Sequence, residues 1–155
     1  MGQVFLIISS LPKECQNHQM WSVNGGAEMR RDMDLVRKLL LTLEGIEKGP
    51  HDVLLIAGNS EEVAVEGRTS DEIYFHLTKI EEAGFLEHVG SGAMTAVTFR
   101  ALSWKGQEFL DAIRDDSIWK KTKEKAGSAS FDVLAAVAKA VLKDRIKSLT
   151  GLDIG

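Results

Sequence analysis

The clearest hydrophobic pattern in the chain is a helical stripe near its centre. Ile73, Leu77 and Ile80 recur at a spacing of three to four residues, which places them on one face of an α-helix. Ser70 can cap the start of this helix, and Gly84 can adopt the left-handed conformation that ends many helices. We therefore expect a helix between these two residues, called the central helix below.

Two extended segments follow the central helix. Residues 85–89 form a short β-like run, and Gly90-Ser91-Gly92 is a turn signal. Residues 95–102 alternate between two faces, as in a half-buried strand. One face carries Val97, Phe99 and Ala101, and the other carries Thr98 and Arg100. The pattern predicts a two-stranded hairpin, called the wing below.

Apolar positions earlier in the chain predict another helix and a short hairpin. The helix is expected to begin at Asp32 or Asp34 and to end at the Gly49-Pro50 pair. Its apolar stripe consists of Val36, Leu39, Leu40 and Leu43. Residues 53–57 are continuously apolar, as in a buried strand, and residues 63–65 predict a second strand beyond a turn.

The chain after the wing is expected to be helical. A helix over residues 104–114 would turn Phe109, Leu110 and Ile113 inward, with Ser103 as its N-cap. Residues 115–117 would end this helix and cap the next segment. A long amphipathic helix is predicted from about Ser130 to Leu149.

The apolar face of this last helix is a candidate partner or oligomer face. Its members are Phe131, Leu134, Ala138, Val141, Leu142 and Leu149. A lone amphipathic helix is marginally stable in water, so this face needs a partner. Packing on the body of the chain and dimerisation are both open, and attachment to a membrane surface through the lysines on the other face is a third alternative.

These elements predict an α+β fold with a winged-helix-like domain: helix, short hairpin, helix, two-stranded wing and further helices. We expect three parts, namely an N-terminal extension over residues 1–28, the winged-helix-like domain over 29–115 and a helical segment over 116–155. The stretch Gly25-Gly26-Ala27-Glu28 can be encoded by a ribosome-binding sequence and spacer before Met29. Translation could therefore start at Met29; the alternative is an N-terminal arm with a Gly-Gly turn.

Two phrases in the centre resemble the winged-helix proteins of bacteria. They are Glu81-Glu82-Ala83-Gly84 after the central helix and Leu102-Ser103-Trp104-Lys105-Gly106 after the wing. One feature departs from that pattern. A standard helix-turn-helix has a helix where residues 53–65 predict strands, and this missing helix normally braces the protein against the DNA backbone.

A narrower resemblance covers residues 29 to about 149. The chain is similar to a family of small bacterial and phage proteins catalogued as a domain of unknown function. The shared motifs are Met29-Arg30-Arg31-Asp32-Met33-Asp34, His76-Leu77, Leu102-Ser103-Trp104-Lys105-Gly106, and Phe109-Leu110-Asp111-Ala112-Ile113-Arg114-Asp115-Asp116-Ser117-Ile118-Trp119. The resemblance implies a phage or mobile-element origin and supports Met29 as the start, but it supplies no activity and no functional residues.

Composition and charge narrow the classes of function. The single cysteine, Cys15, allows neither a disulfide framework nor a cysteine-based metal site. No apolar run reaches membrane-spanning length and no signal peptide is recognisable, so we expect a cytoplasmic protein. Residues 1–115 hold 11 Lys and Arg against 18 Asp and Glu, whereas residues 116–155 hold 8 against 5. Contact with nucleic acid is therefore easier near the C-terminus.

No constellation of catalytic or metal-binding residues is present in the sequence. The four histidines, His18, His51, His76 and His88, lack partners at ligand spacing, and no glycine-rich loop carries the Lys-Ser/Thr of a phosphate site. We expect His76 to be a core or boundary residue, and Trp104 and Trp119 to be core anchors. The sequence predicts a non-enzymatic protein with no cofactor, no metal and no small-molecule ligand.

DNA binding requires cations on the exposed side of the central helix and wing. The candidates are Thr69, Ser70, Lys79, Arg100, Lys105, Lys120, Lys121 and Lys123. However, residues 70–82 carry one lysine against four carboxylates, and this net charge of −3 disfavours contact with phosphate. We therefore expect an adaptor or regulator that acts through protein–protein contacts, with a DNA-binding transcriptional regulator as the alternative.

Overall fold

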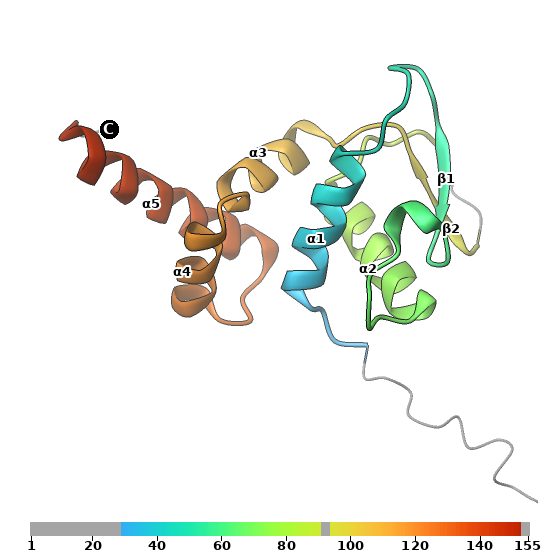
Figure 1. Ribbon diagram of the computed structural model, residues 1–155, viewed down its shortest axis with the longest axis horizontal. Helices are drawn as coiled ribbons and strands as arrows, with labels where there is room; N and C mark the ends of the chain where they lie inside the picture. Colours follow the sequence, from blue (N-terminus) through green and yellow to red (C-terminus); the bar gives the residue numbers. More distant parts are fainter. Residues whose placement is uncertain (1–28, 91–93, 153–155) are drawn as a thin grey trace, which may run out of the picture. The chain divides into compact units, whose positions relative to one another are not determined.

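A computed structural model describes residues 29–90 and 94–152, so residues 1–28, 91–93 and 153–155 lie outside the description. Residues 31–155 group as one compact unit. The prediction that translation starts at Met29 depends on residues 1–28, which lie outside the described residues. The described elements in chain order are α1 (Met33–Glu44), β1 (Leu54–Ala57), the 3-10 helix η4 (Glu61–Val63), α2 (Ser70–Glu82), β2 (Ala96–Phe99), α3 (Trp104–Ile113), α4 (Asp116–Ala126) and α5 (Phe131–Thr150) (Figure 1).

The predicted α+β class is confirmed. The described residues contain five α-helices and one two-stranded antiparallel sheet. Their order is compatible with a winged-helix-like arrangement, in which α2 corresponds to the central helix and β2 to the second strand of the wing.

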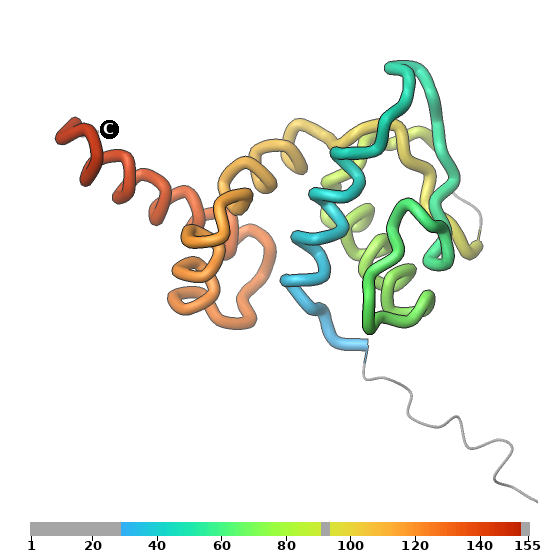
Figure 2. The backbone as a smooth tube through the Cα atoms, in the orientation of Figure 1, coloured from blue at the N-terminus to red at the C-terminus, as the bar shows by residue number. Residues whose placement is uncertain are grey.

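Helix α1 lies at the centre of the 31–155 unit. The chain path in Figure 2 places it between α2 and α3, and it contacts both helices. The stripe Val36, Leu39, Leu40 and Leu43 is almost completely buried, as predicted. Asp32 caps the helix by accepting hydrogen bonds from the amides of Asp34 and Leu35. The helix ends at Glu44, before the Gly49-Pro50 pair that was expected to end it.

The predicted first hairpin is wrong. Strand β1 pairs with β2, with Leu54 opposite Phe99 and Ile56 opposite Val97, and residues 63–65 form no strand. The turn after β1 passes close to α2: a Cβ atom on Gly58 would lie 2.0 Å from the carbonyl oxygen of Ser70. The chain instead forms η4, whose Val63 is fully buried.

The predicted first strand of the wing is wrong: among the described residues, 85–90 form no strand, and β2 pairs with β1 instead. Within residues 85–89, Leu86 forms an isolated bridge with Leu102, and the Glu87 amide donates to the carbonyl of Ala101. Phe85 turns into the core beside α3 instead of extending a sheet. Part of the predicted Gly90–Gly92 turn lies in residues 91–93, outside the described residues.

The remaining helices follow their predicted caps. Ser103 caps α3, Asp115 caps α4 and Ser130 caps α5, each by accepting a backbone amide in the first turn. Helix α2 is capped one residue earlier than expected, by Thr69, which forms a reciprocal capping box with Glu72.

Candidate functional site

The cations predicted on the central helix and wing are engaged within the chain. Lys79 forms an ion pair with Glu82 at 2.6 Å, and Arg100 donates to Glu87 at 2.8 Å. Thr69 is occupied as the cap of α2, while Ser70 is an exposed residue in its first turn. The structure therefore leaves this surface with few uncompensated positive charges.

Lys105 belongs to a different surface. Its ammonium donates to the Ala83 carbonyl at 3.1 Å, lies 3.5 Å from an Asp132 carboxylate oxygen and sits 5.5 Å from the centre of the Phe85 ring. These contacts place Lys105 at the junction of α2, α3 and α5, away from the wing strands with which the sequence grouped it.

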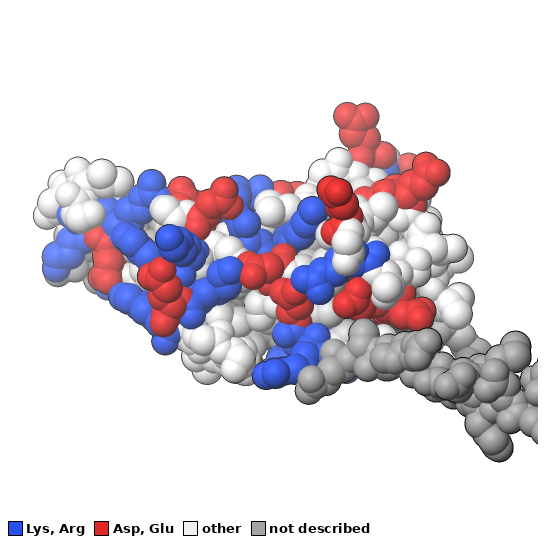
Figure 3. Space-filling model, turned by 60° about the horizontal axis from the view of Figure 1, so that its bottom comes forward, with Lys and Arg blue, Asp and Glu red and all other residues white. Residues whose placement is uncertain are grey.

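The lysines of α4 divide into two groups. Lys123 is held by both carboxylate oxygens of Asp34, at 2.7 and 2.8 Å, and lies over the ring of Trp119. Lys120 and Lys121 are exposed and, among the described residues, form no ion pair. On the face of the molecule drawn in Figure 3, Lys and Arg gather over the end formed by α4 and α5, whereas Asp and Glu are more frequent towards the opposite end.

Most of the predicted partner face on α5 is covered by the chain itself. Leu134 and Ala138 are completely buried, Val141 is 5% exposed, and Phe131 packs against Phe85 and Phe109. Leu134, Ala138 and Val141 are therefore unavailable to a partner, because α3 and α4 pack on α5, whereas Phe131 is half-buried.

The second half of α5 remains open. Leu142 is half-buried and Leu149 is 75% exposed, and both line a hollow of about 540 Å³ that we call the distal groove. Its apolar lining is completed by Ile118 and Ile146. Its charged lining residues are Asp111, Arg114, Asp115 and Arg145.

The charged edge of the distal groove is held in place by the chain's own ion pairs. Arg114 donates to both carboxylate oxygens of Glu44 at 2.7 Å and to Asp111 at 3.0 Å, and these bonds raise its pKa. Hydrogen bonds from Ser117, the Ile118 amide and Arg145 hold the pKa of the Asp115 carboxyl well below its ordinary value.

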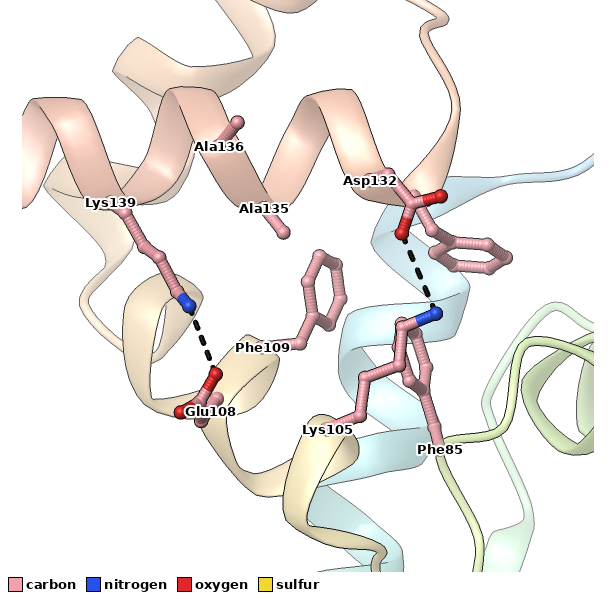
Figure 4. Close-up of a pocket in the computed structure, with 9 residues that line it drawn as sticks. Phe85, Lys105, Glu108, Phe109, Asp132, Ala135, Ala136 and Lys139 are labelled. Carbon is pink, nitrogen blue, oxygen red and sulfur yellow. Dashed lines mark hydrogen bonds and ion pairs between the residues drawn. The ribbon is translucent and has the colours of Figure 1, made fainter.

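A second hollow lies between α3 and the first half of α5 (Figure 4). We call it the aromatic pocket; its volume is about 330 Å³. Phe85 and Phe109 stack with their ring centres 4.9 Å apart, and Phe131 meets Phe85 edge-on at 5.0 Å. The rest of its lining is Lys105, Glu108, Asp132, Ala135, Ala136 and Lys139.

One side of the aromatic pocket is closed by a three-residue network. Glu108 accepts a hydrogen bond from Lys139 at 2.9 Å and another from the Trp104 indole at 3.0 Å. These two donors, with the lysine as the larger influence, lower the pKa of the Glu108 carboxyl. The network ties α3 to α5 at the edge of the pocket.

Trp104 and Trp119 were both expected to be core anchors, and this prediction is wrong for one of them. Trp119 is 4% exposed and donates to Asp34, whereas Trp104 is 82% exposed. The helical periodicity of α3 indicates that Trp104 is exposed. Because Phe109 and Ile113 face the core, residues 104 and 108 fall on the opposite side of α3.

His76 is a core residue, as predicted. Its Nε2 accepts the Asp32 amide at 2.8 Å, and Nδ1 lies 2.6 Å from the Glu72 carbonyl oxygen, so the imidazole bridges the starts of α1 and α2.

Across residues 29–90 and 94–152, no three His, Cys, Asp or Glu side chains group as a metal site. In the same part of the chain, every helix is too short or too polar to span a bilayer.

Comparison with known proteins places this arrangement in a family. A family model described as "Hypothetical protein (DUF2513)" matches residues 30–132. An uncharacterized protein from Haemophilus influenzae is 29% identical over 123 residues, which cover 78% of this chain and 98% of that protein. No solved structure matches the chain significantly. The predicted resemblance to a domain of unknown function is thus confirmed, and the chain belongs to the DUF2513 family.

Proposed function

We propose that this protein is a non-enzymatic adaptor or regulator of phage or mobile-element origin that acts through protein–protein contacts, and that it self-associates through the distal groove. The observation that carries the proposal is the unburied apolar edge of the second half of α5. Leu149 is 75% exposed and Leu152 is 67% exposed, beside the half-buried Leu142 and Ile146. In Figure 1 these last turns extend past α4.

A helix end of this kind gains stability when it is covered. Isolated helical turns are marginal in water, and exposed leucines on such turns favour burial against a partner. Leu149 lines the groove together with Leu142 and Ile146, so the same surface can serve as both an inserted edge and a receiving groove.

A second copy of the chain fits this surface by charge. Residues 143–152 carry three cations and one acid, a net charge of +2, whereas residues 111–116 along the groove carry one arginine and three aspartates, a net charge of −2. These aspartates pair within the chain, Asp111 with Arg114, Asp115 with Arg145 and Asp116 with Arg37. The side chain of Asp111 is nevertheless 66% exposed and that of Asp116 is 93% exposed, so a second copy can approach both acids. A two-fold dimer would set the basic end of each α5 against the acidic edge of the other copy.

The central helix supports the choice of protein partners over DNA. Its net charge is −3, and its one lysine is paired with Glu82. A recognition helix with this balance would be repelled by phosphate, and only a different surface of the protein could contact DNA.

Light scattering after size exclusion tests the dimer at protein concentrations from about 5 to 200 μM, a range that brackets a micromolar affinity. We expect the wild-type chain to shift from monomer to dimer and Leu149→Glu to remain monomeric. Val133→Glu is the matched control, because Val133 is also exposed on α5 but does not line the groove. A wild-type monomer throughout, or an equal effect of both substitutions, would contradict the proposal.

One observation favours the alternative of a DNA-binding transcriptional regulator. Lys121 and Lys125 of α4 and Arg145 of α5 line a shallow hollow of about 180 Å³, and Lys120 is exposed beside them. Anisotropy with a labelled duplex should show binding that weakens steeply with salt, by a slope of about −0.9 per phosphate contact. The triple change of Lys120, Lys121 and Lys125 to Ala should flatten that slope, and no binding at the lowest salt would exclude this function.

A further inference from the structure

The aromatic pocket has the composition of a small-molecule site. Its volume of about 330 Å³ lies at the lower end of the range found for ligand pockets, roughly 300–1,000 Å³. Phe85 and Phe109 are each 1% exposed and stack on each other, so their rings belong to the core beneath the hollow. Between Asp132 and Lys139, α5 contributes only alanines to the lining, and Figure 4 shows the methyl group of Ala135 pointing towards Phe109.

One cation is already positioned over this apolar floor. The Lys105 ammonium is held by the Ala83 carbonyl and lies 5.5 Å from the centre of the Phe85 ring. Its carboxylate partner is weakly bound: Asp132 stands 3.5 Å away and its side chain is 83% exposed. A surface pair of this length contributes little, so a ligand carboxylate can replace Asp132 and leave that acid in water.

The carboxylate on the opposite side of the pocket, Glu108, is harder to displace than Asp132. Glu108 accepts hydrogen bonds from both Lys139 and Trp104, so displacing it would break two bonds at once. The two polar sides of the pocket therefore differ: the side at Lys105 can bind an anion, whereas the side at Glu108 is closed by its own hydrogen bonds.

We propose that the aromatic pocket binds a small aromatic carboxylate about the size of one substituted benzene ring. The ring of the ligand lies against the half-buried Phe131 and Ala135, with the buried rings of Phe85 and Phe109 beneath them, and its carboxylate pairs with Lys105. Such a ligand contacts both α3 and α5, so binding stabilises the packing of α5 on the rest of the 31–155 unit. This inference is independent of the proposed adaptor function.

Titration of the full-length chain with phenylacetate, followed by NMR of ¹³C-methyl and aromatic groups, tests the proposal. Benzyl alcohol and benzylamine are the neutral and cationic controls, and the titration extends to about 10 mM, since so small a ligand binds weakly. We expect phenylacetate to shift the signals of Ala135 and Phe85 and to bind at least fivefold more tightly than either control.

Two variants test the charge of Lys105 and the volume of the aromatic pocket separately. Lys105→Met keeps the length of an exposed side chain and removes its charge, so it should weaken phenylacetate binding at least fivefold and leave benzyl alcohol unchanged; Lys120→Met is the matched control outside the pocket. Ala135→Leu should fill the hollow and abolish binding of both. Absence of shifts at 10 mM, equal binding of benzylamine, or binding that is unaffected by Lys105→Met would overturn the proposal.

Discussion

Gly106→Ala should destabilise the protein, although alanine is ordinarily the better helix residue. Gly106 lies in the first turn of α3, where the helix touches the backbone of Phe85. A Cβ atom at this position would lie 2.3 Å from the Phe85 carbonyl oxygen and about 3 Å from its carbonyl carbon. The same oxygen accepts the Ser103 amide at 2.8 Å, so the helix cannot withdraw without lengthening that hydrogen bond.

The size of the effect follows from three opposing contributions. Replacing glycine by alanine inside a helix favours folding by about 1 kcal/mol. Relieving the contact requires α3 and the Phe85 backbone to separate by roughly 1 Å, and overpacking of this kind costs about 1–3 kcal/mol. Weakening the Ser103 hydrogen bond costs about a further 1 kcal/mol. The expected net loss of unfolding free energy is about 1–3 kcal/mol, with a fall in Tm of roughly 2–12 °C.

Urea denaturation of the wild type and the variant measures this difference directly. Gly45→Ala is the matched control, because Gly45 has a right-handed conformation with φ −79° and its added Cβ would find its nearest neighbours at 3.5 and 3.6 Å. We expect that control to change the unfolding free energy by less than about 0.5 kcal/mol. If the two variants had the same midpoint and the same slope, the close approach at Phe85 would not limit the fold.

Two further predictions concern groups that join distant elements. Arg37 is only 15% exposed and donates to the carbonyls of Ile113 and Arg114 and to Asp116, so Arg37→Lys, which lacks the planar fork, should lower the unfolding free energy by about 1–2 kcal/mol in urea. The pKa of Asp34 is lowered because hydrogen bonds from Lys123 and Trp119 outweigh the opposing effect of burial, and the pKa of Asp115 is lowered by its own hydrogen bonds. Their contribution to stability is present above the ordinary aspartate pKa of 3.8 and is lost as pH falls through the lower folded-state values; unfolding midpoints between pH 5 and 2 should show this loss, with a shallower fall in Asp115→Asn.

The helices were predictable because their signals are local. Ser103, Asp115 and Ser130 each bind an amide two or three residues away, so a short stretch of sequence contains both the donor and the acceptor. The stripe Val36 to Leu43 likewise needs no knowledge of the partner element, since any core would bury the same face. The end of α1 was less predictable, because Gly45 could end the helix as readily as the later Gly-Pro pair.

Strand pairing was not predictable from the same local patterns. The apolar run at 54–57 could pair with any extended segment, and the nearer candidate at 63–65 was the wrong one. Residues 54–57 pair with residues 96–99, and Gly58 approaches the Ser70 backbone; no sequence period relates either set of residues. Partner choice in a sheet depends on such long-range contacts, whereas helix formation depends mainly on neighbours.

The candidate sites were likewise predictable only in part from the sequence. The amphipathic pattern of α5 correctly identified an apolar face, but not which half α3 and α4 would cover. The aromatic pocket combines Phe85 from the α2–wing junction with residues of α3 and α5, so its lining is scattered over more than 50 positions of the sequence. The sequence could suggest Lys105 as a cation, but only the fold shows that it stands over an aromatic floor.

The phrase Leu102–Gly106, which first suggested a winged helix, is explained by structural needs. The Ser103 hydroxyl accepts the Gly106 amide and donates to the Gly84 carbonyl at 2.5 Å, thereby joining the end of α2 to the start of α3. Gly106 permits the close contact with Phe85. Because packing accounts for these residues, they carry no independent evidence for reading DNA. Evidence for function must come from features that packing leaves unexplained, namely the exposed Trp104, the open end of α5 around Leu149 and the unfilled aromatic pocket.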